Sequence, residues 1–235
     1  MISVLDRGDV ASVMATRQRP WSMKCRTLLL VATSALLPAC GPVAPQLVLP
    51  DGSIVTYTEK RNSEGKRVAV GFQDSAGKQH GLWTYLFDES GAVFSQGSYD
   101  HGLKQGLWIA WHSSGQVRNE GRYVNDVEDG EWFSWREDGT RWEHKSYKRG
   151  SLDGEYRSWY DNGQLNTHGF NRAGGHVGKW ESWYENGTLR ARGEWTDNKQ
   201  TGPWLVYRAD GSVDTDESGV YELGNKIAPL PPDQH

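Results

Sequence analysis

The chain has 235 residues, enough for one or two domains, and its composition differs from that of an ordinary globular fold. It contains 28 glycines and 12 tryptophans, while hydrophobic residues make up 36% of the total. This excludes a core built mainly from aliphatic residues and favours aromatic rings set among glycines in short strands and tight turns. Two cysteines, Cys25 and Cys40, precede the glycine-rich region, which excludes a disulfide framework or a cysteine-based metal site for most of the chain.

Residues 23–39 have the features of an export signal. Lys24 and Arg26 form a basic start, and residues 27–37 are an apolar run too short for a bilayer span, which needs about 20 residues. The run ends in Leu-Pro-Ala-Cys-Gly at residues 37–41. This ending resembles the lipobox of bacterial lipoproteins, in which cleavage precedes an invariant cysteine.

The resemblance implies that Cys40 becomes the lipidated first residue of the mature protein, although Pro38 departs from the small residue usual at its position. Several acyl chains such as palmitate would hold such a residue firmly in a membrane. Gly41 favours the outer membrane of a Gram-negative cell, facing the periplasm. Residues 40–50 then form a lipidated, proline-rich tether. A plain signal peptide with an incidental cysteine is the alternative.

Residues 1–22 look like no part of a signal peptide. We therefore hypothesise that translation begins at Met23 and that residues 1–22 are a non-native upstream extension. Removal of residues 1–39 leaves 21 basic and 28 acidic residues, a net charge of −7. This charge argues against nucleic acid as a partner, because nucleic-acid binding depends on neutralising phosphates with Lys and Arg.

A Gly-x-aromatic triplet recurs six times in the rest of the chain, at intervals of 25, 24, 24, 24 and 24 residues. Its leading glycines are Gly81, Gly106, Gly130, Gly154, Gly178 and Gly202. Five residues after each of the last five come Trp111, Trp135, Trp159, Trp183 and Tyr207. Nine residues after the same five come Gly115, Gly139, Gly163, Gly187 and Gly211.

Each 24-residue unit predicts one β-hairpin. A strand rich in Trp and Tyr stops at a turn such as Asn-Gly or Asp-Gly, where both residues tolerate positive φ, and a second strand returns to a polar link. We therefore expect an all-β fold, an elongated single-layer antiparallel meander of about six 24-residue units over residues 81–226. Residues 51–80 are predicted to be an N-terminal cap hairpin, and residues 227–235 a disordered tail.

The pattern G-x-W-x-x-W-Y-x-N-G-x-L-x-x-x-G resembles the MORN repeat, in the bacterial variant found in proteins catalogued as YwqK-family antitoxins. The resemblance covers Gly81 to about Lys226 and is closest over residues 154–201. It implies the same ribbon of hairpins. It also implies a module that interacts with proteins or lipids.

The sequence contains no arrangement typical of catalysis, so we expect no enzyme activity and no cofactor. No Ser-His-Asp set, phosphate-binding loop or dinucleotide fingerprint is present. The histidines occupy mostly different positions in the repeat and are interpreted as scattered surface residues rather than a metal site. They are His80, His101, His112, His144, His168, His176 and His235.

Strand alternation places the rings two and five residues after the leading glycine on opposite faces of the sheet. Both rows could be structural, or the second row, Trp111, Trp135, Trp159, Trp183 and Tyr207, could bind a partner. The sequence thus predicts a membrane-anchored, non-catalytic module that binds an unidentified protein in the periplasm or at the cell surface. The alternative is binding of cell-wall glycan or peptidoglycan through exposed aromatic rings.

Overall fold

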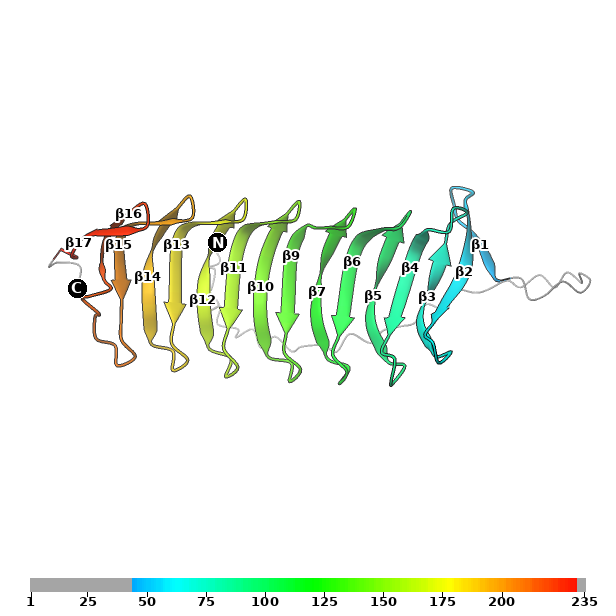
Figure 1. Cartoon of the computed structure of the whole chain (residues 1–235), viewed down its shortest axis with the longest axis horizontal. Helices are drawn as coiled ribbons and strands as arrows, with labels where there is room; N and C mark the ends of the chain where they lie inside the picture. The colour runs from blue at the N-terminus through cyan, green and yellow to red at the C-terminus, as the bar shows by residue number, and fades with distance from the viewer. Residues whose placement is uncertain (1–43, 232–235) are drawn as a thin grey trace, which may run out of the picture. The chain divides into compact units, whose positions relative to one another are not determined.

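The computed structural model describes residues 44–231, so Cys40, the predicted signal segment and residues 232–235 lie outside the described part. Within it the protein is all-β: 17 strands form one open sheet, and these residues contain no helix (Figure 1). It follows that the described part of the chain has no helix that could cross a membrane.

The strands differ in length but follow the repeat. The N-terminal half of the sheet contains β1 (Gln46–Val48), β2 (Ile54–Arg61), β3 (Arg67–Gln73), β4 (Gln79–Leu86), β5 (Val93–Asp100), β6 (Leu103–Trp111), β7 (Val117–Val124), β8 (Val127–Glu128) and β9 (Gly130–Trp135). The C-terminal half contains β10 (Arg141–Lys148), β11 (Ser151–Trp159), β12 (Leu165–Arg172), β13 (Gly175–Trp183), β14 (Leu189–Thr196), β15 (Lys199–Val206), β16 (Gly219–Glu222) and β17 (Asn225–Ala228).

The strands form a meander in which each pairs antiparallel with the next along the chain. β7 departs slightly from this order, since it pairs with the short β8 and also with β9. The strands stand side by side in one row, with hairpin turns along the lower edge and links along the upper edge (Figure 1). The predicted antiparallel meander of repeated hairpins is confirmed.

The tight two-residue turns are at the links, not at the Asn-Gly and Asp-Gly positions. At Asn125-Asp126 and Asp197-Asn198 both residues have positive φ, as in a type I′ turn. At residues 160–164, by contrast, Gly163 alone has positive φ, at 82°. The N–H of Gly163 donates to Tyr160 O, as in a type I turn followed by a glycine bulge. The turns predicted at Asn-Gly and Asp-Gly are therefore present, but the glycine is the residue that adopts positive φ there.

The leading glycine of each unit marks a shift in strand register. Gly97 of β5 pairs with Trp108 of β6, yet Ser98 pairs with Gln105, so Gly106 and Leu107 have no partners in β5. Gly106 has φ of 76°, which an L side chain rarely adopts. Glycine is thus required at this position, because the register shift places Trp108 opposite Gly97.

That tryptophan lies flat against a glycine of the preceding strand. A Cβ added to Gly169 would lie 2.1 Å from Cδ2 of Trp180, so a hydrogen is all that fits beneath the ring. The indole N–H of Trp180 donates to Phe170 O at 3.0 Å, next to the glycine and at the register shift. The same contact of ring and glycine joins Gly71 to Trp83, Gly97 to Trp108, Gly121 to Trp132 and Gly193 to Trp204.

The fourth unit replaces both members of this pair. Lys145 stands at the glycine position, and the smaller ring of Tyr156 lies opposite it instead of a tryptophan. The Lys145 ammonium is 2.6 Å from the carboxylate of Glu143. A larger side chain on one strand is thus matched by a smaller ring on the next.

Trp132 has the ring contact without the hydrogen bond. Its Nε1 is buried and makes no hydrogen bond within the described residues. By analogy with the other units the acceptor would be Arg122 O, which instead accepts the N–H of Asp129 at 2.9 Å. The third unit, where β8 interrupts the strand, is therefore held by packing without this bond.

The ends of the sheet correct two predictions. The tether expected over residues 40–50 includes β1, because Gln46–Val48 pair with residues 54–56 of β2. The disordered tail expected from residue 227 begins inside β17, which extends to Ala228. Leu230 is also buried, at 6% exposure. Short segments at both ends thus extend the sheet.

We predict that Gly169→Ala destabilises the sheet by about 1–3 kcal/mol, the usual cost of overpacking. Because Gly169 does not have positive φ, the effect isolates the contact with Trp180. Urea unfolding followed by circular dichroism would measure it. An unchanged midpoint would contradict the requirement for glycine beneath the ring.

A matched control is available in the fourth unit. Tyr156→Trp alone should destabilise the sheet, because Lys145 occupies the space beneath the ring. The double variant Lys145→Gly, Tyr156→Trp should be more stable than that single variant, since it recreates the pair found in other units. Additive effects of the two changes would count against the pairing.

Candidate functional site

The two aromatic rows lie on opposite faces of the sheet. Directly paired residues share a face, so the pairs Trp108–Gly121 and Trp180–Gly193 identify one face, called here the ladder face. It carries Trp83, Trp108, Trp132, Tyr156, Trp180 and Trp204. The other, called the groove face, carries Trp111, Trp135, Trp159, Trp183 and Tyr207. The predicted separation of the two rows is confirmed.

The ladder face is the core of this single-layer sheet. Trp83 is fully buried, and Trp108, Trp180 and Trp204 are at most 8% exposed. Tyrosines fill the spaces between the tryptophans: the ring centroid of Tyr99 lies 5.0 Å from that of Trp108 in an edge-to-face contact. Burial, together with a hydrogen bond to Tyr85, raises the pKa of Tyr99 far above its usual value. These rings are therefore occupied in stabilising the fold.

The groove-face rings are half-buried, and the preceding unit holds their backbone. Tyr160 Oη donates to Trp183 O and Tyr184 Oη to Tyr207 O, each at 2.8 Å. His112 and Arg136 take the same position in earlier units and reach Trp135 O and Trp159 O. Each hairpin end is thereby tied to the next, which fixes the spacing of the rings.

Ionisable side chains run across the middle of the groove face. His144, Arg157 and His168 lie on successive strands in direct cross-strand pairs. Glu155 joins them: its carboxylate is 2.6 Å from Arg157, 2.9 Å from His168 and 3.8 Å from His144. The His144 ring stacks on Phe133 with centroids 4.7 Å apart. This face thus combines aromatic rings with a network of ionisable side chains around Glu155.

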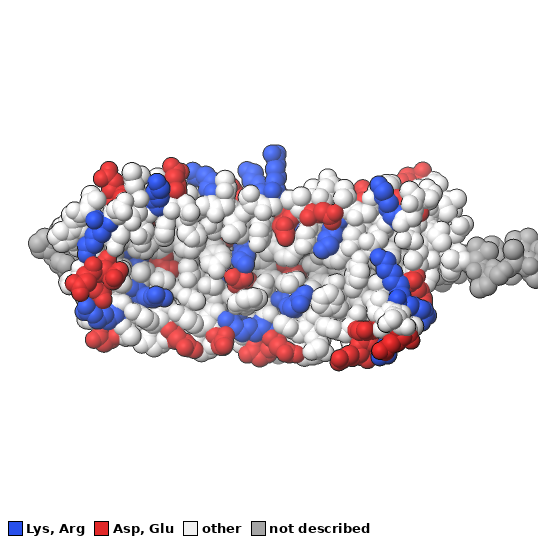
Figure 2. Space-filling model, in the orientation of Figure 1, with Lys and Arg blue, Asp and Glu red and all other residues white. Residues whose placement is uncertain are grey.

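A hollow of about 390 Å³ opens in the sheet where the rings meet this network. Phe133, which is 37% exposed, pairs with His144 on the side away from Arg157. The residues that line the hollow include Glu120, Phe133, Trp135, His144, Arg157 and Trp159. In Figure 2 basic and acidic side chains are intermixed over the visible face, with acidic ones recurring along the lower edge. The hollow suits a ligand with both apolar and polar groups.

The structure distributes the predicted site residues unevenly. Trp135 and Trp159 line the hollow together, whereas Trp111, Trp183 and Tyr207 occupy the same row in other units. The predicted turn glycines all have positive φ: Gly115, Gly139, Gly163, Gly187 and Gly211. Phe133, His144 and Arg157 were not singled out from the sequence, since their shared place becomes evident only from the strand register.

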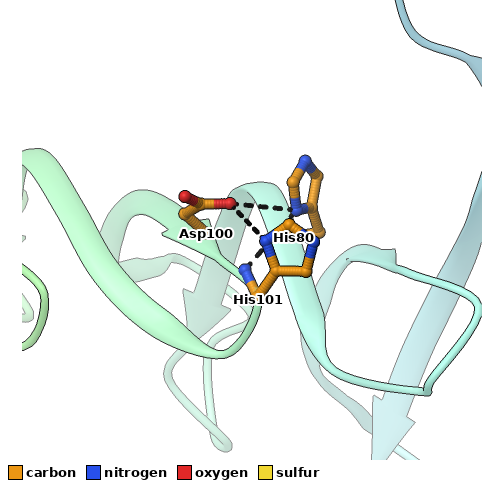
Figure 3. Close-up of side chains that lie close together, drawn as sticks. All are labelled: His80, Asp100 and His101. Atoms are coloured by element: carbon orange, nitrogen blue, oxygen red, sulfur yellow. Dashed lines mark hydrogen bonds and ion pairs between the residues drawn. The ribbon is translucent and has the colours of Figure 1, made fainter. Parts of the chain in front are cut away.

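A second cluster forms at the link between β5 and β6. His80, Asp100 and His101 each offer a ligand atom, and these atoms lie within 4.8 Å of one another (Figure 3). The histidines were interpreted as scattered because they take different positions in the repeat. The signal that could have found them is a separation of 20 to 22 residues, which brings neighbouring links together. Gln105 and Asn125, 20 residues apart, meet in the same way in the next unit.

The comparison with protein families agrees with this geometry. A family described as a MORN repeat variant matches residues 104–125, 152–170 and 177–197. These stretches correspond to the hairpins β6–β7, β11–β12 and β13–β14. The chain thus carries MORN repeat variants, which are generally interaction or binding modules. No curated protein matches the chain.

We predict that Tyr160→Phe and Tyr184→Phe each destabilise the sheet by about 0.5–1.5 kcal/mol, the net value of one hydrogen bond. Each removes a bond to the next unit without changing the ring. Denaturant unfolding would measure the loss. Tyr207→Phe is the control, because the Tyr207 hydroxyl makes no hydrogen bond within residues 44–231, and an equal loss there would contradict the role of the bond.

Proposed function

We propose that this protein is a non-catalytic interaction module that binds an extended segment of a protein partner on its groove face. The observation that carries the proposal is that one face of the sheet is packed internally while the other exposes aromatic rings. The tryptophans of the ladder face are buried by internal packing, while the groove face has accessible aromatic rings beside a hollow. MORN repeats in three stretches support binding as the general role.

The chemistry of the groove face favours a peptide of mixed character. Phe133, Trp135 and Trp159 offer apolar surface, and Arg157 and Glu120 offer charges of both signs at the same hollow. Aromatic side chains beside satisfied polar groups are typical of the centre of protein interfaces. Neighbouring units repeat the rings at one hairpin interval, so an extended segment lying across the strands would meet several in turn.

We further propose that the module is a lipoprotein of the bacterial cell envelope, anchored through Cys40 and facing the periplasm from the outer membrane. The support is the sequence of residues 23–41, with its basic start, short apolar run and lipobox-like end. The resemblance to YwqK-family antitoxins names one class of partner, a toxin protein.

Anchoring is tested with the chain expressed from Met23. We expect this form to sediment with membranes and to incorporate labelled palmitate, while Cys40→Ser loses the label and the membrane association. Cell fractionation and immunoblotting would measure both. Membrane association of Cys40→Ser equal to that of the parent would refute the anchor, and failure of export from Met23 would refute the proposed start.

Binding is tested by photocrosslinking in cells, with a photoreactive amino acid replacing Phe133. We expect capture of one defined protein, and loss of that capture when Trp159→Ala is added. Leu223 is the matched control position, because it is 67% exposed and lies in the turn between β16 and β17.

Two results would contradict the proposal. Equal capture from position 223 would show that the groove face is not the binding surface. Retention of the purified protein on peptidoglycan, lost with Trp159→Ala, would favour the glycan alternative. Unfolding of Trp159→Ala, checked by circular dichroism, would show that the Trp159 ring stabilises the fold and does not serve mainly in binding.

A further inference from the structure

The cluster at the link between β5 and β6 has the residue types and spacing of a metal site. His80 Nδ1 lies 3.6 Å from Asp100 Oδ1, and His101 Nδ1 lies 2.7 Å from the same oxygen. Zn²⁺ binds nitrogen and oxygen ligands at about 2.0–2.2 Å in tetrahedral geometry, which places two ligands of one ion about 3.3 Å apart. Small side-chain rotations would therefore bring all three atoms to one ion.

The backbone holds these side chains close before any ion binds. His101 and Gly102 are the central residues of the link turn, with φ of 47° and 92°. The N–H of Gly102 donates to Gln79 O at 2.7 Å, which joins this turn to the strand that carries His80. The rings of His80 and His101 meet edge to face with centroids 5.0 Å apart. The two ends of the hairpin β4–β5 and the link that follows it thus contribute to one preorganised cluster (Figure 3).

Asp74 lies close enough to His101 to become, after a small side-chain rotation, the outer partner that metal-binding histidines use. Its Oδ2 is 4.0 Å from Nε2 of His101, the ring nitrogen that does not face Asp100. Its Oδ1 accepts the N–H groups of Ala76 and Lys78 at 2.9 Å each. The hydrogen bond from Lys78 is the main cause that lowers the pKa of Asp74. A carboxylate that fixes the second ring nitrogen orients the histidine and strengthens it as a ligand.

Other links place different residues at the three corresponding positions. In the next unit these are Gln105, Val124 and Asn125, which include no metal-ligand pair. In the following two units basic side chains stand at the turn, at Lys148, Arg149 and Arg172. The backbone arrangement is shared, but the full ligand set occurs at this link alone among the described residues.

We propose that His80, Asp100 and His101 bind a divalent ion of the borderline class, Zn²⁺ foremost, with Asp74 as a positioning residue for His101. Imidazole and carboxylate ligands suit such ions. On binding, the ion replaces the hydrogen bond between His101 Nδ1 and Asp100 Oδ1, because each nitrogen that binds the ion must carry no proton. The ion ties β4 to the link that follows β5, and a fourth coordination position is left for water or for a ligand from a partner.

The test uses the full-length protein, purified without a histidine tag and freed of metal with a chelator. Titration calorimetry with Zn²⁺ should show one saturable site per chain, and Zn²⁺ should raise the thermal unfolding midpoint. The variant His80→Ala, His101→Ala should lose at least tenfold in affinity. Asp74→Asn should lose about 10- to 100-fold, as outer partners do. Circular dichroism without metal would check that each variant is folded.

The matched control is His144→Ala, His168→Ala. It also removes two histidines that flank a carboxylate, Glu155. Retained affinity in this control, with loss at His80 and His101, supports the assignment. Absence of saturable Zn²⁺ binding, or loss of affinity in the control with none in the His80 and His101 variant, overturns it. Absorption of bound Co²⁺, unchanged by the control and abolished by the site variant, is an independent readout of the ligand set.

Discussion

The structure depends on the contact between a tryptophan and a glycine one strand away. A single-layer sheet has no second layer to bury its side chains, so each large ring must be covered by its own neighbours. A flat indole over a glycine achieves this, and the tyrosine beside it closes the remaining edge. The indole N–H is used as well, since it bonds a carbonyl at the register shift. Packing, register and hydrogen bonding are thus coupled at one position in the units of Trp83, Trp108, Trp180 and Trp204.

This coupling explains why the two faces differ. Once the ladder face carries the core, the opposite face is free to vary without loss of the fold, and it carries charges, half-buried rings and a hollow. The side chains that reach from one hairpin end to the carbonyl of the next preserve the spacing of those rings. A repeated, rigid surface with varied side chains is well suited to recognition.

The links add another level of organisation. Their type I′ turns fold each hairpin tightly against the next, and a donor in the turn bonds a carbonyl of the preceding unit. Residues 20 to 22 positions apart therefore become neighbours at every link. In three links the N–H of a turn residue donates to a side-chain oxygen of Gln105, Asp129 or Asp153. At His80 and His101 the same geometry brings together metal-binding side chains.

The sequence by itself determined the repeat, the hairpin and the separation of the aromatic rows, because a 24-residue period and strand alternation are local properties of the chain. It also showed the positions of the turn glycines. Three features were decided by the tertiary structure. The contact of Trp180 with Gly169, the place of His144 between Phe133 and Arg157, and the contact of His80 with His101 all depend on register between strands. Register is set by bulges and turn types, which composition and spacing alone do not specify.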